Sequence, residues 1–200
     1  MMNNQTQYFT NRLNQSSSMF VGLLFTYCAE LLLPLYETFS KKNNYGNLPD
    51  LKNVLDKLWN APLAGPSMDY LGDSDKVNQQ IPDIDKFDNL EATFAQDFCI
   101  CLDAAILAYS NNREESLIEY FFEPLRLAVC HKKYGVLDVG SDLESEFEDY
   151  FSKSELLNAA TSQLNKLFDS YETQVNFNEN LIKTLRRNAI ESSWSIDMLK

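Results

Sequence analysis

The spacing of apolar positions predicts an all-α chain. Apolar residues recur three and four positions apart over long stretches, most clearly from Leu90 to Tyr109, and this period is typical of an amphipathic helix. The chain has only 6 Gly and 6 Pro, few for a sandwich or barrel whose many strands each need turn residues. We therefore predict one helical domain over residues 1–200, a bundle of about six to eight helices.

Two further helices are predicted in the first third of the chain. After a short amphipathic turn carrying Tyr8, the hydroxyls of "NQSSS" suit the start of a helix over about 18–39. Pro34 should kink this helix, because proline removes a backbone donor and clashes one turn back. Another helix is predicted from Pro49 to about Trp59.

The C-terminal third predicts either one long helix or a helix pair. A helix over about 114–134 should end at Gly135. From Leu157 onward a narrow apolar seam continues to Ala189. An unbroken helix over 153–189 would be roughly 55 Å long, whereas the Asn-rich "VNFNEN" favours a break near Asn176.

The longest apolar run predicts a core helix and not a membrane span. "MFVGLLFTYCAELLL" covers only Met19 to Leu33 and contains Glu30, while a spanning helix needs about 20 apolar residues. The N-terminus lacks a signal-peptide pattern. Four cysteines lie in apolar surroundings without a CxxC, so we expect buried, reduced thiols. We predict a cytoplasmic protein with no membrane partner.

The net charge bears on possible partners. A formal charge of −12 repels nucleic-acid phosphates, so nucleic acid is not an expected partner. Much of the negative charge lies in one acidic run. This run is either a solvated face at the start of a helix or a docking patch for a basic partner. Its members are Asp138, Asp142, Glu144, Glu146, Glu148 and Asp149.

The densest group of carboxylates, in "IPDIDKFDN", favours helix capping over metal binding. Asp88 is predicted to cap the following helix, and Glu91 three residues later completes a capping box. As a calcium loop the segment lacks the required Gly and the Glu at the twelfth position. Ser141 and Glu144 repeat the capping-box pattern. We expect no bound metal or cofactor.

Few residues are available for catalysis. His131 is the only histidine, so a multi-histidine zinc site is excluded, and its place before Gly135 suits a helix C-terminus. Phosphate-cradling and dinucleotide motifs are absent. Glu30 and Asp97, carboxylates inside apolar helices, remain as catalytic candidates, because burial raises carboxyl pKa values and creates general acids. The alternative is a structural hydrogen bond to a neighbouring helix.

Four segments carry a family resemblance. "ELLLPLYETF", "LDKLW", "IPDIDKFD" and "AQDFC" follow one another in the first half of the chain. Together they resemble the uncharacterised bacterial YjaG-like family, which implies an all-helical cytoplasmic domain of unknown role. The chain departs from that pattern at Leu31, where an arginine is usual, and at Lys86, where an aspartate is common. The first departure leaves Glu30 without an obvious partner. The resemblance highlights Glu30, Pro34, Tyr36, Phe39, Trp59, Pro82, Phe87, Asp88, Asp97 and Cys99.

Three functions remain open. The leading hypothesis is a non-catalytic protein-interaction module that binds an unknown protein partner or itself, through the C-terminal seam or the acidic run. The second is a hydrolase-like enzyme that uses Glu30 and Asp97, with or without a metal. The third is an acidic mimic of nucleic acid that sequesters a basic protein, suggested by net charge alone.

Overall fold

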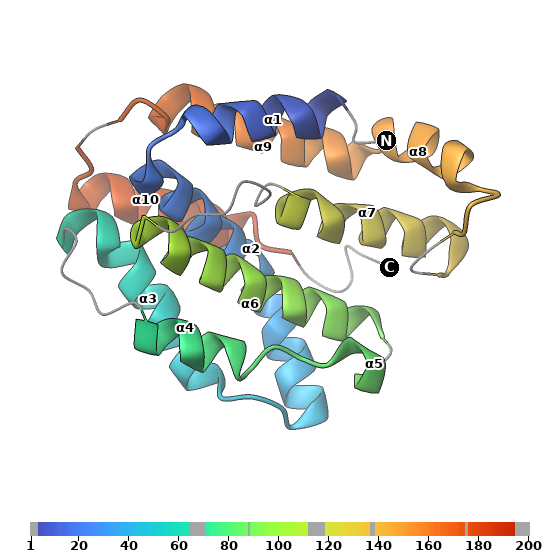
Figure 1. The fold of residues 1–200 in the computed structure, drawn as a ribbon, viewed down its shortest axis with the longest axis horizontal. Helices are drawn as coiled ribbons and strands as arrows, with labels where there is room; N and C mark the ends of the chain where they lie inside the picture. The colour runs from blue at the N-terminus through green and yellow to red at the C-terminus, as the bar shows by residue number, and fades with distance from the viewer. Residues whose placement is uncertain are drawn as a thin grey trace.

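The computed structural model describes residues 4–64, 71–87, 89–111, 119–136, 139–174 and 176–194. These residues form ten helices and no strand, which confirms the all-α prediction (Figure 1). In chain order the helices are α1 (Asn4–Gln15), α2 (Ser18–Asn43), α3 (Leu48–Ala64), α4 (Leu71–Asn78), α5 (Ile84–Phe87), α6 (Leu90–Tyr109), α7 (Glu119–Tyr134), α8 (Glu144–Ser152), α9 (Glu155–Tyr171) and α10 (Glu179–Glu191).

The number of helices exceeds the predicted six to eight because two short segments are helical. α1 forms 12 residues of helix where the sequence predicted only a short turn. α5 is a four-residue helix inside the segment expected to be a loop. Of the two C-terminal alternatives, one long helix or a helix pair, the structure has the pair. α9 ends at Tyr171, and α10 begins at Glu179 and is capped by Asn178.

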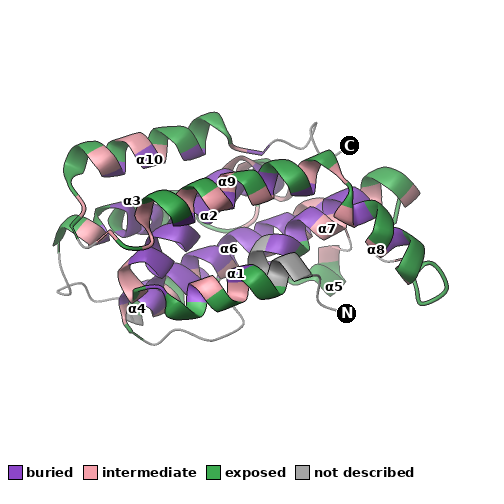
Figure 2. Ribbon diagram, turned by 90° about the horizontal axis from the view of Figure 1, so that it is seen from above, coloured by how far each residue is buried: buried purple, intermediate pink, exposed green. Residues whose placement is uncertain are grey.

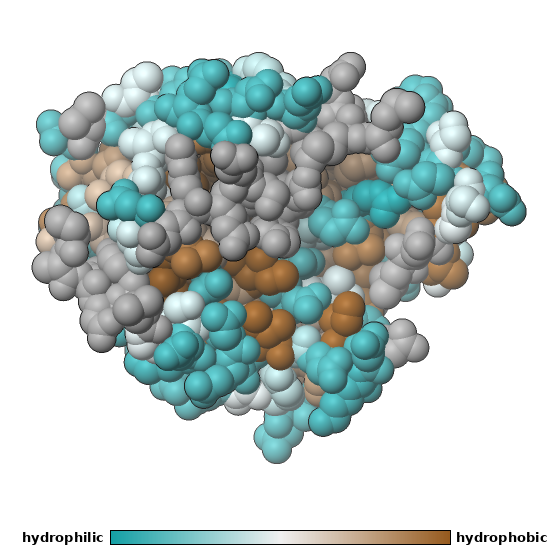
Figure 3. Space-filling model, in the orientation of Figure 1, coloured by the Kyte–Doolittle hydropathy of each residue, from teal (hydrophilic) through white to brown (hydrophobic). Residues whose placement is uncertain are grey.

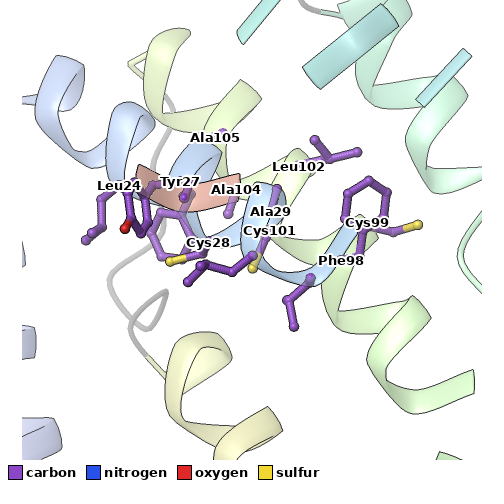
Figure 4. Close-up of a cluster of buried hydrophobic side chains, with 14 of the residues drawn as sticks. Leu24, Tyr27, Cys28, Ala29, Phe98, Cys99, Cys101, Leu102, Ala104 and Ala105 are labelled. Carbon is purple, nitrogen blue, oxygen red and sulfur yellow. The ribbon is translucent and has the colours of Figure 1, made fainter. Parts of the chain in front are cut away.

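The two most apolar helices, α2 and α6, pack on each other along the centre of the bundle (Figures 1 and 4). Both are long and apolar enough to cross a membrane, yet 78% and 72% of their most apolar windows are buried inside the protein, which is typical of helices at the centre of a bundle. Small residues allow the close approach: a Cβ on Gly22 would lie 2.6 Å from Cε1 of Tyr109. Figure 4 shows Cys28 of α2 and Cys101 of α6 in this cluster, and all four cysteine thiols are buried.

Pro34 lies inside α2, which continues through it from Ser18 to Asn43. A proline has no N–H, so the carbonyl of Glu30, one turn back, lacks its usual helical donor. The carbonyl of Leu31 accepts a hydrogen bond from the Trp194 N–H at 2.9 Å. The segment that follows α10 is thereby fixed to the middle of α2.

The remaining helices cover this central pair with their apolar faces inward (Figure 2). The seam predicted along α9 and α10 is buried at Leu157, Leu164, Leu185 and Ala189, so it packs within the protein's own bundle. α1 lies beside α9 (Figure 1), where Arg12 donates to both carboxylate oxygens of Glu172 at 3.0 and 2.8 Å.

The exposed large hydrophobic side chains are spread over several elements of the described chain. Figure 3 shows a band of hydrophobic residues across the middle of one face, at the level of α6, with hydrophilic residues below it. None of the exposed large hydrophobic side chains lies on α6. They are scattered instead, as Tyr8, Leu63, Ile84, Val136, Leu143, Tyr150 and Ile190.

The start of α6 corrects one capping prediction. The N-cap is Asn89 and not Asp88, which lies outside the described residues; the Asn89 Oδ1 accepts from the Ala92 N–H at 2.9 Å. Asn and Asp cap equally well, so the sequence did not separate two adjacent candidates. Glu91 therefore falls at the second helical position, and its carboxylate accepts from Lys42 Nζ at 3.1 Å instead of closing a capping box.

The start of α8 corrects the other capping prediction. α8 begins at Glu144 after the cap position Leu143, whose side chain makes no capping hydrogen bond, so Ser141 is not the cap. Gly140 has a left-handed φ of 69°, and the chain makes a turn over 141–143 before the helix can begin. Glu144 points to Arg126 of α7 instead, at 2.6 Å.

The cap at Asn89 gives a stability prediction. Asn89→Ala should lower the free energy of unfolding by about 1 kcal/mol, because one N–H of the first turn loses its acceptor. Asn89→Asp should retain most of the stability, since a carboxylate caps the same N–H. Urea unfolding followed by circular dichroism measures both. Equal losses in the two variants would show that the side chain at position 89 is not the cap.

Candidate functional site

Glu30 joins three helices through a charge network in which its own carboxylate is the buried member. Its side chain is almost fully buried in α2, accepts a hydrogen bond from Trp59 Nε1 of α3 at 2.6 Å, and pairs with Arg186 Nε of α10 at 3.1 Å. Burial raises the pKa of Glu30, and the charge of Arg186 and the Trp59 N–H oppose that rise. Arg186 also binds Asp56 of α3 at 2.5 Å.

The partner of Glu30 comes from a distant part of the chain. The family resemblance pointed to an arginine beside Glu30, and Leu31 occupies that place. Arg186 supplies the cation from 156 residues away. No local pattern in the sequence signals this pairing, because the helical period of α10 marks Arg186 only as a residue of the polar face. Both donors bind the same oxygen of Glu30, Oε2, so this carboxylate ties α2 to α3 and to α10.

Asp97 has a different environment. It lies in α6 with 6% of its surface exposed, and its Oδ2 has no hydrogen-bond partner among the described residues. Burial raises the pKa of this carboxyl well above its usual value, and the negative charge of Glu123 on α7 raises it further. A carboxyl of this kind is most stable in its protonated form.

The two candidate carboxylates do not share partners. Glu30 is bound to α3 and α10, whereas the charged group that acts on Asp97 lies on α7. Within the described part of the chain, His, Cys, Asp and Glu side chains form no group of three suited to a metal ion. Asp83, one of the clustered aspartates, accepts instead from the Asp85 N–H at 3.1 Å, at the start of α5.

Carboxylates of the acidic run form ion pairs that hold α8 against α7. Glu144 and Glu148 both bind Arg126, at 2.6 and 3.2 Å, and the Arg126 guanidinium lies 5.0 Å from the centre of the Phe147 ring. Glu146 pairs with Lys133 at 3.4 Å. Asp149 pairs with Lys153, four residues later at the end of α8, at 2.7 Å. Asp138 lies outside the described residues. Cations of this chain thus occupy most of the acidic run.

A polar cleft opens between α2, α9 and α10. Its volume is about 520 Å³, within the range of small-molecule sites. Residues with hydroxyl or amide groups make up most of its described lining, which also has one lysine and no Asp or Glu. The polar side chains are Tyr27, Ser162, Gln163, Lys166, Ser170, Tyr171, Asn188 and Ser192.

Helical spacing aligns these side chains along the cleft. Ser162, Lys166 and Ser170 are four residues apart on α9, so they share one face of that helix. Asn188 and Ser192 have the same spacing on the opposite wall. The apolar face of α9, with Leu164 and Phe168, is buried, which turns the polar face outward to the cleft.

Tyr27 brings a hydroxyl from the core helix into this cleft. The side chain is 4% exposed, and its hydroxyl accepts a hydrogen bond from Gln163 Nε2 at 2.6 Å. Burial raises the pKa of Tyr27, while hydrogen bonds with Gln163 and Ser192 lower it. The phenol is therefore a neutral group held in place by both walls, suited to binding and not to nucleophilic attack.

The sequence does not indicate this cleft. Its local pattern predicts that Tyr27 is a core aromatic residue and that the polar residues of α9 form a solvated helix face. Only the placement of α10 beside α9 and α2 brings them together. A second hollow of about 410 Å³ lies between α7, α8 and the start of α9, and Lys132 and Lys153 are among its lining residues.

This chain is similar, in sequence and in structure, to proteins of one family of unknown function. The family model described as "Protein of unknown function (DUF416)" matches residues 9–196. The crystal structure of a DUF416 family protein from Shewanella baltica OS155 is similar, with a TM-score of 0.74 and 20% sequence identity over 92% of this chain and 94% of that one. No match is found among curated proteins. At this identity the structural likeness shows the fold alone.

The Glu30 network gives a second prediction. Arg186→Gln should destabilise the protein by about 3 kcal/mol, because it leaves a buried carboxylate without its cation. The double variant Glu30→Gln with Arg186→Gln should recover part of that loss, since no buried charge then remains unpaired. Urea unfolding of the parent, both single variants and the double variant measures the coupling. Additive losses would contradict a direct Glu30–Arg186 interaction.

Asp97 gives a pH-dependent prediction. Its folded pKa is raised above the unfolded value of about 3.9, so its contribution to stability is fully present below that pH and is lost as pH rises through the folded pKa. Asp97→Asn removes this titration. The variant should therefore gain stability relative to the parent as pH increases from 4 toward 8.

The measurement is the free energy of unfolding of parent and variant across that pH range. The exposed Asp75→Asn is the control for losing one negative charge. A difference between Asp97→Asn and the parent that stays constant with pH would show that Asp97 ionises as readily in the folded protein as in the unfolded chain.

Proposed function

Since the chain belongs to the DUF416 family, described only as proteins of unknown function, we propose its role from its own geometry. It acts as a non-catalytic binding protein, and the cleft between α2, α9 and α10 takes a small polar molecule. The predicted cytoplasmic location is part of this proposal, because four buried thiols suit a reducing compartment. So is kinship with the YjaG-like proteins, which rests on the motifs in the first half of the chain.

The lining of the cleft carries the proposal. The chain has 29 acidic residues among its 200, yet the lining that the structure describes for the cleft includes no Asp or Glu. Hydroxyl and amide groups line it from three helices, and Gln163 and Ser192 orient the Tyr27 hydroxyl within it. Such groups both donate and accept hydrogen bonds, so they recognise a polar ligand without providing a strong acid, base or nucleophile.

A small ligand is favoured over the protein partner that the sequence suggested. The seam proposed for partner binding is buried inside the bundle, and the acidic run is largely bound by Arg126, Lys133 and Lys153. The same ion pairs weaken the case for an acidic mimic of nucleic acid. The carboxylate-based hydrolase would require Glu30 to leave Arg186, and the lining of the cleft includes neither Glu30 nor Asp97.

Nuclear magnetic resonance of the full chain with a panel of sugars, polyols, organic acids, amino acids and nucleosides tests the proposed function. At least one compound should shift the side-chain amide signals of Gln163 and Asn188. Ala159→Trp should abolish the response, because the indole fills the cleft that Ala159 lines.

The matched control is Asn158→Trp, which places the same indole at the neighbouring exposed position of α9, outside the lining. This variant should bind as the parent does. A response that survives Ala159→Trp, or no response to any class of compound, would contradict the proposal.

A further inference from the structure

We infer that the ligand of this cleft is a small polyhydroxylated molecule with a single anionic group, such as a sugar acid. The inference rests on the proposed function and adds the chemical class of the ligand. It follows from the one charged side chain of the cleft and from the neutral groups around that side chain.

Lys166 is the charged residue in question. It lines the cleft from the middle of α9, and it takes part in none of the ion pairs formed among the described residues. Its neighbours four residues away on either side are Ser162 and Ser170, both uncharged. An ammonium group without an ion-pair partner among the described residues, in a cleft whose described lining has no Asp or Glu, is a binding point for a negative group of a ligand.

The net charge of the protein limits how negative that ligand is. One lysine lies in the cleft, while the whole chain carries a charge of −12. A ligand with several phosphates would be repelled by that field and would find one cation to offset it. A cationic ligand would find no carboxylate. A single negative charge therefore fits the cleft best.

The neutral groups determine the rest of the ligand. Gln163 and Asn188 each offer an amide donor and a carbonyl acceptor from opposite walls, and serine hydroxyls stand beside both. A hydroxyl of the ligand also donates and accepts, so a row of hydroxyls pairs with this lining where an apolar chain would leave it unsatisfied. Tyr171 adds an apolar ring surface with a polar tip at the edge of the cleft.

Binding of gluconate, glucitol and acetate to the full chain, measured by calorimetry at low ionic strength, tests the inference. Gluconate combines the carboxylate with the hydroxyls, glucitol has the hydroxyls alone, and acetate has the charge alone. Gluconate should bind at least tenfold more tightly than either. Added salt should weaken gluconate binding but not glucitol binding, because salt screens the contact with Lys166.

Two variants separate a local contact from the overall charge. Lys166→Met should weaken gluconate about tenfold, to the level of glucitol, and leave glucitol unchanged. Lys132→Met removes the same charge from the other hollow and should leave gluconate binding nearly unchanged. Both sites are on the surface of the helices, so a matched melting temperature confirms that each variant is folded.

Three results overturn the inference. Equal binding of glucitol and gluconate would show that the charge is irrelevant, and the proposed polar-ligand function would still stand. Equal effects of Lys166→Met and Lys132→Met would show that only net charge acts. Absence of gluconate binding at about millimolar concentrations, the weak end of specific affinity, would rule out this ligand class. The broad compound panel tests the proposed function separately.

Discussion

The packing of α2 on α6 is the contact on which the rest of this structure depends. Both helices are apolar on nearly all sides, so each must be surrounded by other helices. Gly22 and the small residues of α6 let the two axes approach closely, and the remaining helices complete the cover. Because burial of apolar surface is the main favourable term in folding, this central pair sets where every other element can lie.

The position of α10 depends on two polar contacts with that central pair. Arg186 pairs with Glu30 in the middle of α2, and the backbone N–H of Trp194 donates to the carbonyl of Leu31, the next residue of α2. Both contacts lie on one turn of α2, so together they hold the C-terminal helix and the segment that follows it. The wall of the polar cleft formed by α10 is positioned by the same two contacts.

Many acidic side chains among the described residues form ion pairs with Arg and Lys of the same chain. Carboxylates of the acidic run tie α8 to α7 through Arg126 and Lys133, and Glu172 ties α9 to α1 through Arg12. The polar cleft is the exception, since its described lining has no carboxylate and includes Lys166, which forms no ion pair among the described residues. That contrast supports the proposal that the cleft binds a small polar ligand.

The sequence by itself determined the class of fold, because helical period and apolar spacing are local properties. It placed α2 and α6, left one long C-terminal helix and a helix pair as alternatives, identified Glu30 and Asp97 as carboxylates inside apolar helices, and predicted buried thiols. It placed the caps of α6 and α8 wrongly, at Asp88 and Ser141, since adjacent polar residues compete for one cap and the choice depends on how the preceding turn leads into the helix. Tertiary structure alone decided that Arg186 pairs with Glu30, that Asp97 has no such partner among the described residues, and that Tyr27, Gln163, Lys166 and Asn188 meet in one cleft. These residues are far apart in the chain, and a helix's own period states which face is polar but not which other helix that face will meet.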